Sequence, residues 1–199
     1  MRQQRWGVTL ALLLATVGWG GEAQGQYATA IQRLQLSAFG GATGVFTGLS
    51  GGKNFSVTVG GDLGLPPFHG VRPTIEVRGT YPADRGLVDN QKSVLGGLRV
   101  DFLLGHRWHP YADLLVGRGE MDYTPYGYLY QNFVYDLTTT LVYSPGVGFD
   151  YDLTEHWGVK VDGQIQRWGS TPTPSGSIYS RLGTAAIVYR FDFNRHAMR

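Results

Sequence analysis

The sequence predicts an all-β fold: a closed, eight-stranded, antiparallel up-and-down barrel that crosses a membrane. About eight segments place apolar residues at every second position, which is the period of a strand with two unlike faces. The connections between these segments are alternately long and short. The polar face carries glycine and opposite charges instead of the Lys and Glu that crowd a water-facing surface. We therefore expect the apolar face to meet lipid and the polar face to line a narrow interior.

The composition fits one folded unit. The chain has 199 residues, of which 42% are hydrophobic and 16% are charged. The net charge of +2, without a long basic run, argues against a nucleic-acid partner. With no cysteine, the fold must be stable without disulfides.

The N-terminus has the pattern of a secretory signal peptide. Arg2 and Arg5 precede an apolar run over residues 8–17, and small residues follow up to Gly25. The run is about ten residues long, whereas a membrane-spanning helix needs roughly 20. We expect a cleaved signal peptide over residues 1–25, a barrel over 26–193 and a short tail over 194–199.

The first four strands are expected over residues 32–42, 54–63, 71–81 and 92–104. Their alternating apolar residues are Leu34, Leu36 and Ala38; Val57, Val59 and Leu63; Ile75, Val77 and Tyr81; and Val94, Leu98, Val100, Phe102 and Leu104. Polar residues such as Thr58, Glu76 and Arg99 occupy the positions between them. Each segment therefore has one apolar and one polar face.

The last four strands are expected over residues 110–118, 138–152, 157–168 and 178–193. Their outward residues are Ala112, Leu114 and Val116; Leu141, Tyr143, Val147, Phe149 and Tyr151; Trp157, Val159, Val161 and Ile165; and Ala185, Ile187, Tyr189, Phe191 and Phe193. Asp113, Asp150, Lys160 and Arg190 are among the residues of the opposite face. The same period of two holds in all four segments.

The connections predict a barrel whose two ends face different compartments. The longer ones centre on TGVFTGLSGGK, PADRGLVDNQ, EMDYTPYGYLYQNFVYDL and STPTPSGS, and the shorter ones are GLPPFHG, GHRWH and LTEH. Aromatic residues near the strand ends fit two interfacial belts: Tyr111, Tyr151, Trp157, Phe191 and Phe193 at the short turns, and Phe55, Tyr81, Tyr143, Trp168 and Tyr179 at the long loops. The third long loop is rich in aromatics, which favours either strand extension above the membrane or a surface for an external partner.

Together, these features resemble the small eight-stranded outer-membrane β-barrels of Gram-negative bacteria, the group that includes the OmpA transmembrane domain and OmpX. The resemblance implies short periplasmic turns, longer extracellular loops, location in the outer membrane and a monomer. It also implies that the alternate residues Tyr189, Phe191 and Phe193 form the C-terminal signal recognised by the outer-membrane assembly machinery. In many relatives the phenylalanine is the last residue, whereas NRHAMR follows it here.

The interior of an eight-stranded barrel is only wide enough to be filled by side chains, which disfavours a wide pore. We expect an internal charge cluster of Glu76, Arg78, Arg99, Asp101, Asp150, Lys160, Asp162 and Arg190. Asp150 and Lys160 should face each other across the short turn between their strands. The cluster acts either as a structural plug of paired charges or as a gate in a narrow solute path.

Three outward arginines stand where strands meet long loops: Arg118, Arg167 and Arg181. With Lys53, Arg85 and Lys92 nearby, they form either a rim that binds lipopolysaccharide phosphates or ordinary solvated loop charges.

These observations favour a non-enzymatic outer-membrane protein with a structural or surface-interaction role, without a cofactor, metal or catalytic residues. The histidines argue against a lipid-modifying enzyme at the outer rim, because four lie in the short turns and one in the tail: His69, His106, His109, His156 and His196. A GxSxG nucleophile motif is also missing from the sequence. The alternatives are a narrow channel or carrier for small or hydrophobic solutes and a periplasmic, soluble lipocalin-like barrel.

Overall fold

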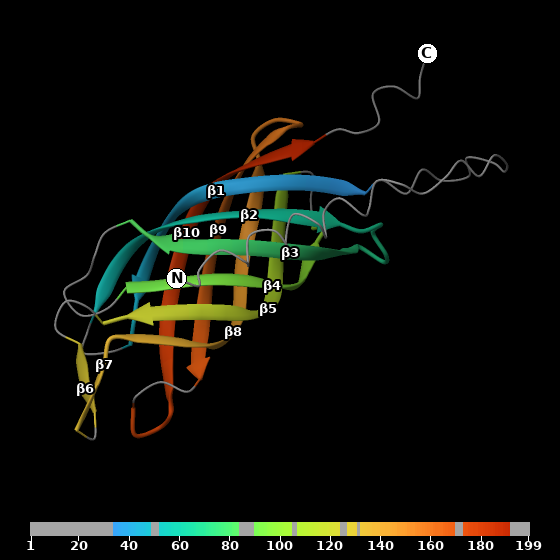
Figure 1. Ribbon diagram of the computed structural model, residues 1–199. Coiled ribbons are helices and arrows are strands. Elements are labelled where there is room, and N and C mark those ends of the chain that lie inside the picture. The colour runs from blue at the N-terminus through green and yellow to red at the C-terminus, as the bar shows by residue number, and fades with distance from the viewer. Residues whose placement is uncertain are drawn as a thin grey trace, which may run out of the picture. The chain divides into compact units, whose positions relative to one another are not determined.

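The computed structural model describes residues 34–48, 52–83, 90–104, 107–123, 127–130, 132–169 and 173–191. Its strands are β1 (Gln35–Phe46), β2 (Lys53–Gly64), β3 (Val71–Pro82), β4 (Asn90–Phe102), β5 (Trp108–Asp122), β6 (Tyr128–Tyr130), β7 (Phe133–Tyr135), β8 (Leu137–Asp152), β9 (Trp157–Gly169) and β10 (Ser177–Phe191). Eight of them form a closed antiparallel barrel in the order β1-β10-β9-β8-β5-β4-β3-β2 (Figure 1). The predicted fold class is confirmed.

The barrel closes where the first and last strands pair. β1 and β10 are antiparallel, with Ala42 opposite Ala185 and Thr43 opposite Thr184. Closure leaves no unpaired strand edge, which a sheet surrounded by hydrocarbon cannot tolerate. Among the described residues, no helix is long and apolar enough to span a membrane.

The two faces of the strands differ as predicted. In β9, Ile165 is 53% exposed, whereas Lys160 is fully buried and Gln166 nearly so. Ile187 in β10 is likewise exposed between the buried residues Ala186 and Val188. This inverts the arrangement of a soluble barrel, because the apolar side chains point away from the enclosed interior. The predicted lipocalin-like alternative is therefore wrong.

Inward glycines make room for inward aromatic rings. Phe39 lies opposite Gly60, and a Cβ atom on that glycine would lie 2.4 Å from Cζ of Phe39. Tyr111 lies opposite Gly148, where an added Cβ would be 2.6 Å from Cζ of the ring. The narrow interior thus requires some of its glycines because aromatic rings occupy the neighbouring space.

Two aromatic residues were wrongly expected in the interfacial belts. Tyr111 is 3% exposed and Trp168 is 1% exposed, and both side chains lie inside the barrel. Trp168 is on the inward phase of β9, two residues from the buried Gln166. Tyr111 shares the inward phase of Asp113. Position near a strand end was therefore a poorer guide than the alternation itself.

The exposed aromatics near the strand ends form two bands on the outer surface. Phe55, Tyr81, Tyr143 and Tyr179 are exposed near the long loops. At the short turns, Trp157 and Phe191 both have exposed side chains, and the ring of Tyr189 packs between them. Bands of this kind are typical of the two membrane–water interfaces of outer-membrane barrels.

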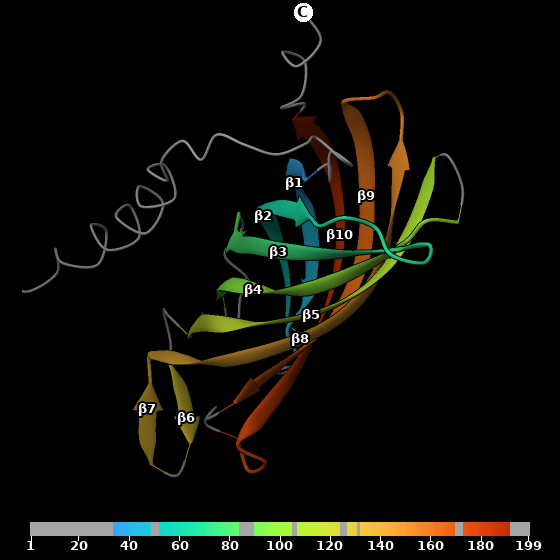
Figure 2. The same cartoon turned by 90° about the vertical axis from the view of Figure 1, so that its right-hand side faces the viewer.

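The third long loop contains both expected strand extension and a separate hairpin. β5 and β8 remain paired as far as Asp122 and Leu137. Between them, β6 and β7 form their own two-stranded sheet, which lies at the same end of the barrel as the β9–β10 connection (Figures 1 and 2). Leu129, Phe133 and Val134 are exposed in this hairpin. We call this end of the barrel the loop end and the opposite one the turn end.

Several predicted features lie outside the described residues. They are the signal peptide over 1–25, the tail over 194–199, Arg85, His106, Phe193 and His196.

Candidate functional site: the barrel interior

The barrel interior is built in layers. An apolar cluster fills the loop end and consists of Leu95, Leu115, Met121, Tyr123, Val142, Trp168 and Ile178. A row of hydroxyls follows, in which Oγ1 of Thr43 lies 2.6 Å from Oγ1 of Thr58 and 3.1 Å from Oγ1 of Thr184. Toward the turn end lies a network of buried charges, which we call the charge network: Asp62, Glu76, Arg78, Arg99, Asp101, Asp113, Asp150, Lys160 and Asp162.

Arg78 joins strands on opposite sides of the barrel. Its Nε donates to Oε1 of Glu76 at 2.6 Å, and its Nη1 donates to Oδ1 of Asp162 at 3.2 Å. Its Nη2 is 3.1 Å from the other oxygen of Asp162. β3 and β9 are not neighbours in the sheet, so the guanidinium group spans the interior between them.

Lys160 is the most deeply buried cation of the charge network. Its side chain has no solvent exposure, and its Nζ donates to Oδ2 of Asp62 at 3.0 Å and to Oε2 of Glu76 at 3.3 Å. The ammonium group also lies 3.7 Å from the centroid of the Phe39 ring. Asp150 is directly opposite Lys160 in the sheet register, but within the network its carboxylate pairs with Arg99.

Arg99 binds the largest number of carboxylates. Its Nε donates to Asp101 at 2.6 Å, its Nη1 donates to Asp62 at 3.3 Å, and its Nη2 pairs with Asp150. The guanidinium carbon lies 3.6 Å from the centroid of the Tyr111 ring. Burying a guanidinium group is costly without such partners, so this geometry fixes the positions of four strands relative to one another.

The charge network contains two carboxylates that are not in the predicted cluster. Asp62 binds both Arg99 and Lys160, and Asp113 accepts a hydrogen bond from Nε2 of Gln164 at 3.4 Å. Both residues are on the inward phase of their strands, so alternation was the signal that could have included them. Among the described residues, the buried charges are three cations and six carboxylates.

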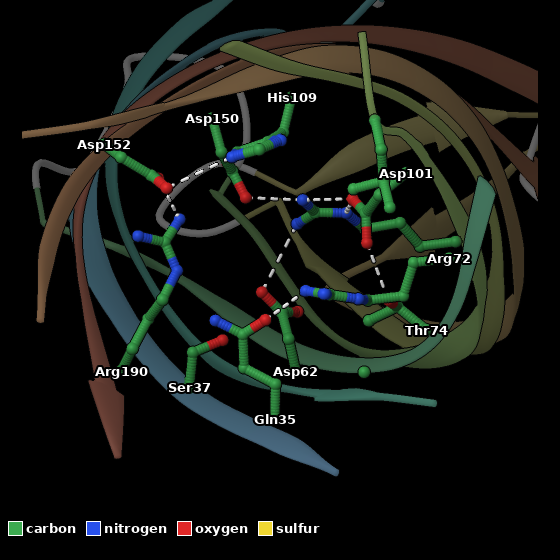
Figure 3. Close-up of a pocket in the computed structure, with 13 residues that line it drawn as sticks. Gln35, Ser37, Asp62, Arg72, Thr74, Asp101, His109, Asp150, Asp152 and Arg190 are labelled. Carbon is green, nitrogen blue, oxygen red and sulfur yellow. Dashed lines mark hydrogen bonds and ion pairs between the residues drawn. The ribbon is translucent and has the colours of Figure 1, made fainter. Parts of the chain in front are cut away.

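Arg190 pairs with Asp152 instead of with the network carboxylates, and it lines a polar cup at the turn end that Asp62, Arg99, Asp101 and Asp150 also line (Figure 3). Its Nη2 is 2.5 Å from Oδ1 of Asp152, whose other oxygen lies 3.1 Å from Nε2 of His109. Arg72 donates to Gln35 across the same cup, which has a volume of about 290 Å³. Of the eight residues in the predicted cluster, seven therefore meet in the charge network and Arg190 does not.

The three predicted rim arginines lie on the outer surface near the loop end. Arg118, Arg167 and Arg181 are exposed, and none pairs with an acidic side chain among the described residues. Lys92 differs from them, because its Nζ is 2.5 Å from Oε1 of Glu120. Lys53 lies 5.7 Å from the centroid of the Phe46 ring.

The described residues of the proposed assembly signal belong to the last barrel strand. Tyr189 and Phe191 are on the outward phase of β10, with ring centroids 5.0 Å apart. Within the part of the chain that the structure describes, no group of three or more His, Cys, Asp or Glu side chains could hold a metal ion.

A closed eight-stranded antiparallel barrel with an apolar outer surface and a filled polar interior defines a β-barrel of the outer-membrane type. Solved structures with this fold are similar to the chain. Neisserial surface protein A is 16% identical with a TM-score of 0.51, over 80% of this chain and 97% of that one. Ail of Yersinia pestis, in complex with the heparin analogue sucrose octasulfate, is 10% identical with a TM-score of 0.50, over 79% of this chain and 99% of that one.

The outer membrane enzyme PagL also matches, with 15% identity and a TM-score of 0.43, over 79% of this chain and 99% of that one. No protein-family profile and no curated protein sequence matches the chain. The chain thus has the fold of the small outer-membrane barrels, and a fold by itself assigns no activity.

Proposed function

We propose that the chain is a non-enzymatic barrel of the cell outer membrane, with a structural or surface-interaction role and without a wide pore. The observation that carries this proposal is the filled interior. The apolar cluster occupies the loop end, and the charge network crosses the barrel toward the turn end. A hydrated pore would have to pass both layers.

The charge network supports a structural role because its groups are paired across the barrel. Each of its cations contacts at least two carboxylates, and most of these pairs join different strands. Burial makes an unpaired charge costly, so the paired state is favoured over an open one. The network therefore acts as a plug that also holds the strands in register.

Planar-bilayer recording tests the absence of a wide pore. Folded protein added to a bilayer in concentrated KCl should produce no stable conductance steps, whereas a porin added to the same bilayer should produce them. Reproducible open levels that scale with the amount of inserted protein would contradict the proposal.

A narrow cation path is the second candidate, and the excess of carboxylates favours it. Among the described residues, three buried cations face six buried carboxylates, an excess that would leave the interior negative and would repel anions. The polar cup gives this interior an opening at the turn end. Should small conductance steps occur, a KCl gradient should give a reversal potential that favours K⁺. A preference for Cl⁻ would contradict this candidate.

The positions of the histidines support a non-enzymatic role. The described ones, His69, His109 and His156, belong to the turn end, which the proposed orientation puts on the opposite side from the outer leaflet. Incubation of the folded barrel with lipopolysaccharide should leave the mass of its lipid unchanged. If the lipopolysaccharide lost an acyl chain during the incubation, the barrel would be an enzyme.

The β6–β7 hairpin supports a surface-interaction role. Leu129, Phe133 and Val134 are exposed on it, beyond the paired ends of β5 and β8. Exposed apolar groups on a projecting element often mark a recognition surface. We infer that an external partner would contact the barrel through this hairpin.

A further inference from the structure

Two grooves on the outer surface meet at Arg118. The first, which we call the apolar groove, has a volume of about 410 Å³ and lies over β2 to β5, beside Val59, Gly79 and Val94. The second, the arginine groove, has a volume of about 660 Å³ and lies over β5, β8 and β9. Arg118 and Thr139 line both grooves, so the two form one continuous depression near the loop end.

Gly79 creates the apolar groove. It is on the outward phase of β3, between Val77 and Tyr81, whose side chains are both exposed. A Cβ atom at this position would come no closer than 3.9 Å to any neighbour, at the carbonyl oxygen of Ser93. The missing side chain leaves a gap among apolar neighbours, and the groove extends from the loop end toward the middle of the barrel.

The arginine groove presents two cations, Arg118 and Arg167. Arg118 on β5 is opposite Leu141 of β8, and Arg167 on β9 is opposite Tyr143 of the same strand. β8 therefore separates the two arginines, and two strand spacings with the two-residue offset from Leu141 to Tyr143 place their backbones about 12 Å apart. Neither pairs with an acidic side chain among the described residues, and the nearby carboxylate of Glu120 is bound to Lys92.

Charge and shape together identify the chemistry of the ligand. A guanidinium group binds phosphate through two parallel hydrogen bonds, and two such groups across one strand match two phosphates on one head group. The adjoining apolar groove can hold a hydrocarbon chain that runs along the barrel wall. An amphiphile with a bisphosphorylated head would match both grooves.

We propose that this depression binds one lipid A molecule of the outer leaflet, with its phosphates between Arg118 and Arg167 and one acyl chain beside Gly79. The inference rests on the proposed outer-membrane location. Of the three arginines in the predicted lipopolysaccharide rim, it assigns phosphate binding to Arg118 and Arg167. Arg181 is on β10 and lines neither groove, so it is expected to contribute little.

Native mass spectrometry of the full-length folded protein, with diphosphoryl lipid A added in detergent, tests the head-group contacts. The double variant Arg118→Gln with Arg167→Gln should bind lipid A at least about a hundredfold more weakly, since each of the two removed contacts is a charge-assisted hydrogen bond. Arg181→Gln is the matched control and should bind like the wild type. If the double variant binds lipid A as strongly as the wild type does, the proposal is overturned.

A second pair of variants tests the acyl chain. Gly79→Leu puts a side chain into the apolar groove, where its Cβ atom has no neighbour closer than 3.9 Å, and should weaken binding roughly tenfold because the acyl chain loses its apolar contacts. Gly183→Leu is its control, since a Cβ atom there has no neighbour within 4 Å and the residue lines neither groove. If Gly79→Leu and Gly183→Leu bind lipid A equally well, the acyl chain does not lie beside Gly79.

Phosphatidylglycerol separates a lipid A site from general attraction of anionic lipids. The wild type should retain diphosphoryl lipid A at least tenfold more strongly, and equal retention would overturn the proposal. A heat-dependent gel shift of every variant checks that the barrel is folded. If the wild-type protein is folded but does not bind lipid A, only this inference is contradicted. If the wild-type protein shows no gel shift, the proposed function is contradicted as well.

Discussion

The Nζ atom of Lys160 lies 3.0 Å from Oδ2 of Asp62, although the residues are 98 positions apart in the sequence and their strands are not neighbours. Both side chains are buried inside the barrel. A contact of this kind stabilises the barrel only while both charges remain, because either one alone would be an unpaired charge away from water.

Replacing Lys160 by Met should destabilise the barrel by about 3–5 kcal/mol. The side chain is similar in length, but Asp62 and Glu76 lose a shared cation and Asp62 keeps only Arg99. The free energy of unfolding can be measured by urea titration of the protein folded into lipid vesicles.

Lys53→Met is the matched control for this titration. Lys53 is exposed on β2, and we expect its replacement to leave the urea midpoint almost unchanged. If Lys160→Met and Lys53→Met unfold at the same urea concentration, the charge network is not a stabilising plug.

Replacing Gly119 by Val should destabilise the apolar cluster. A Cβ atom at position 119 would lie 2.3 Å from Cζ3 of Trp168 and 2.8 Å from Cγ2 of Val142. Overpacking of a filled interior costs about 1–3 kcal/mol, which a lower urea midpoint would show. Gly44→Val is the control, because no atom lies within 4 Å of its Cβ position. A tolerated change at Gly119 would mean that the loop end of the interior is open.

Tyr111 should stabilise the charge network in two separable ways. Its hydroxyl donates to Oδ2 of Asp162 at 3.2 Å, and its ring lies against the guanidinium group of Arg99. Tyr111→Phe removes only the hydrogen bond and should cost about 1–3 kcal/mol, whereas Tyr111→Leu should cost about 2 kcal/mol more because the ring is lost too. Equal unfolding free energies for the two variants would exclude the ring contact.

The absence of cysteine from the sequence allows a direct test of orientation. Single cysteines at Phe133, in the β6–β7 hairpin, and at Leu153, in the β8–β9 turn, would both be exposed at opposite ends. A membrane-impermeant maleimide should label position 133 on intact cells and position 153 only after the outer membrane is permeabilised. The reverse result would show that the loop end faces the periplasm.

The alternation of residues was sufficient to predict the eight barrel strands and their faces. Ile165 and Lys160 are five positions apart on opposite phases of one strand, and the structure exposes the first and buries the second. This succeeds because a one-residue shift would move every side chain of a strand to the wrong face, so the pattern must be regular.

The partners within the interior could not be predicted in the same way. Asp150 and Lys160 are opposite each other, yet Lys160 binds Asp62 and Glu76 from strands across the barrel. Long side chains reach beyond their own neighbours, and strand pairing does not specify how far. The β6–β7 hairpin was also beyond prediction, because its aromatic sequence suits both a separate hairpin and longer barrel strands.

Solid-state NMR in lipid bilayers tests the central claim, that the apolar face meets lipid and the opposite face is enclosed. Ile187 and Val188 are neighbours on β10, with 59% and 1% of their surfaces exposed. Magnetisation from the acyl chains should reach the methyl groups of Ile187 quickly and those of Val188 only slowly. Rapid transfer from bulk water to Ile187, with no transfer from lipid, would contradict the membrane-spanning arrangement.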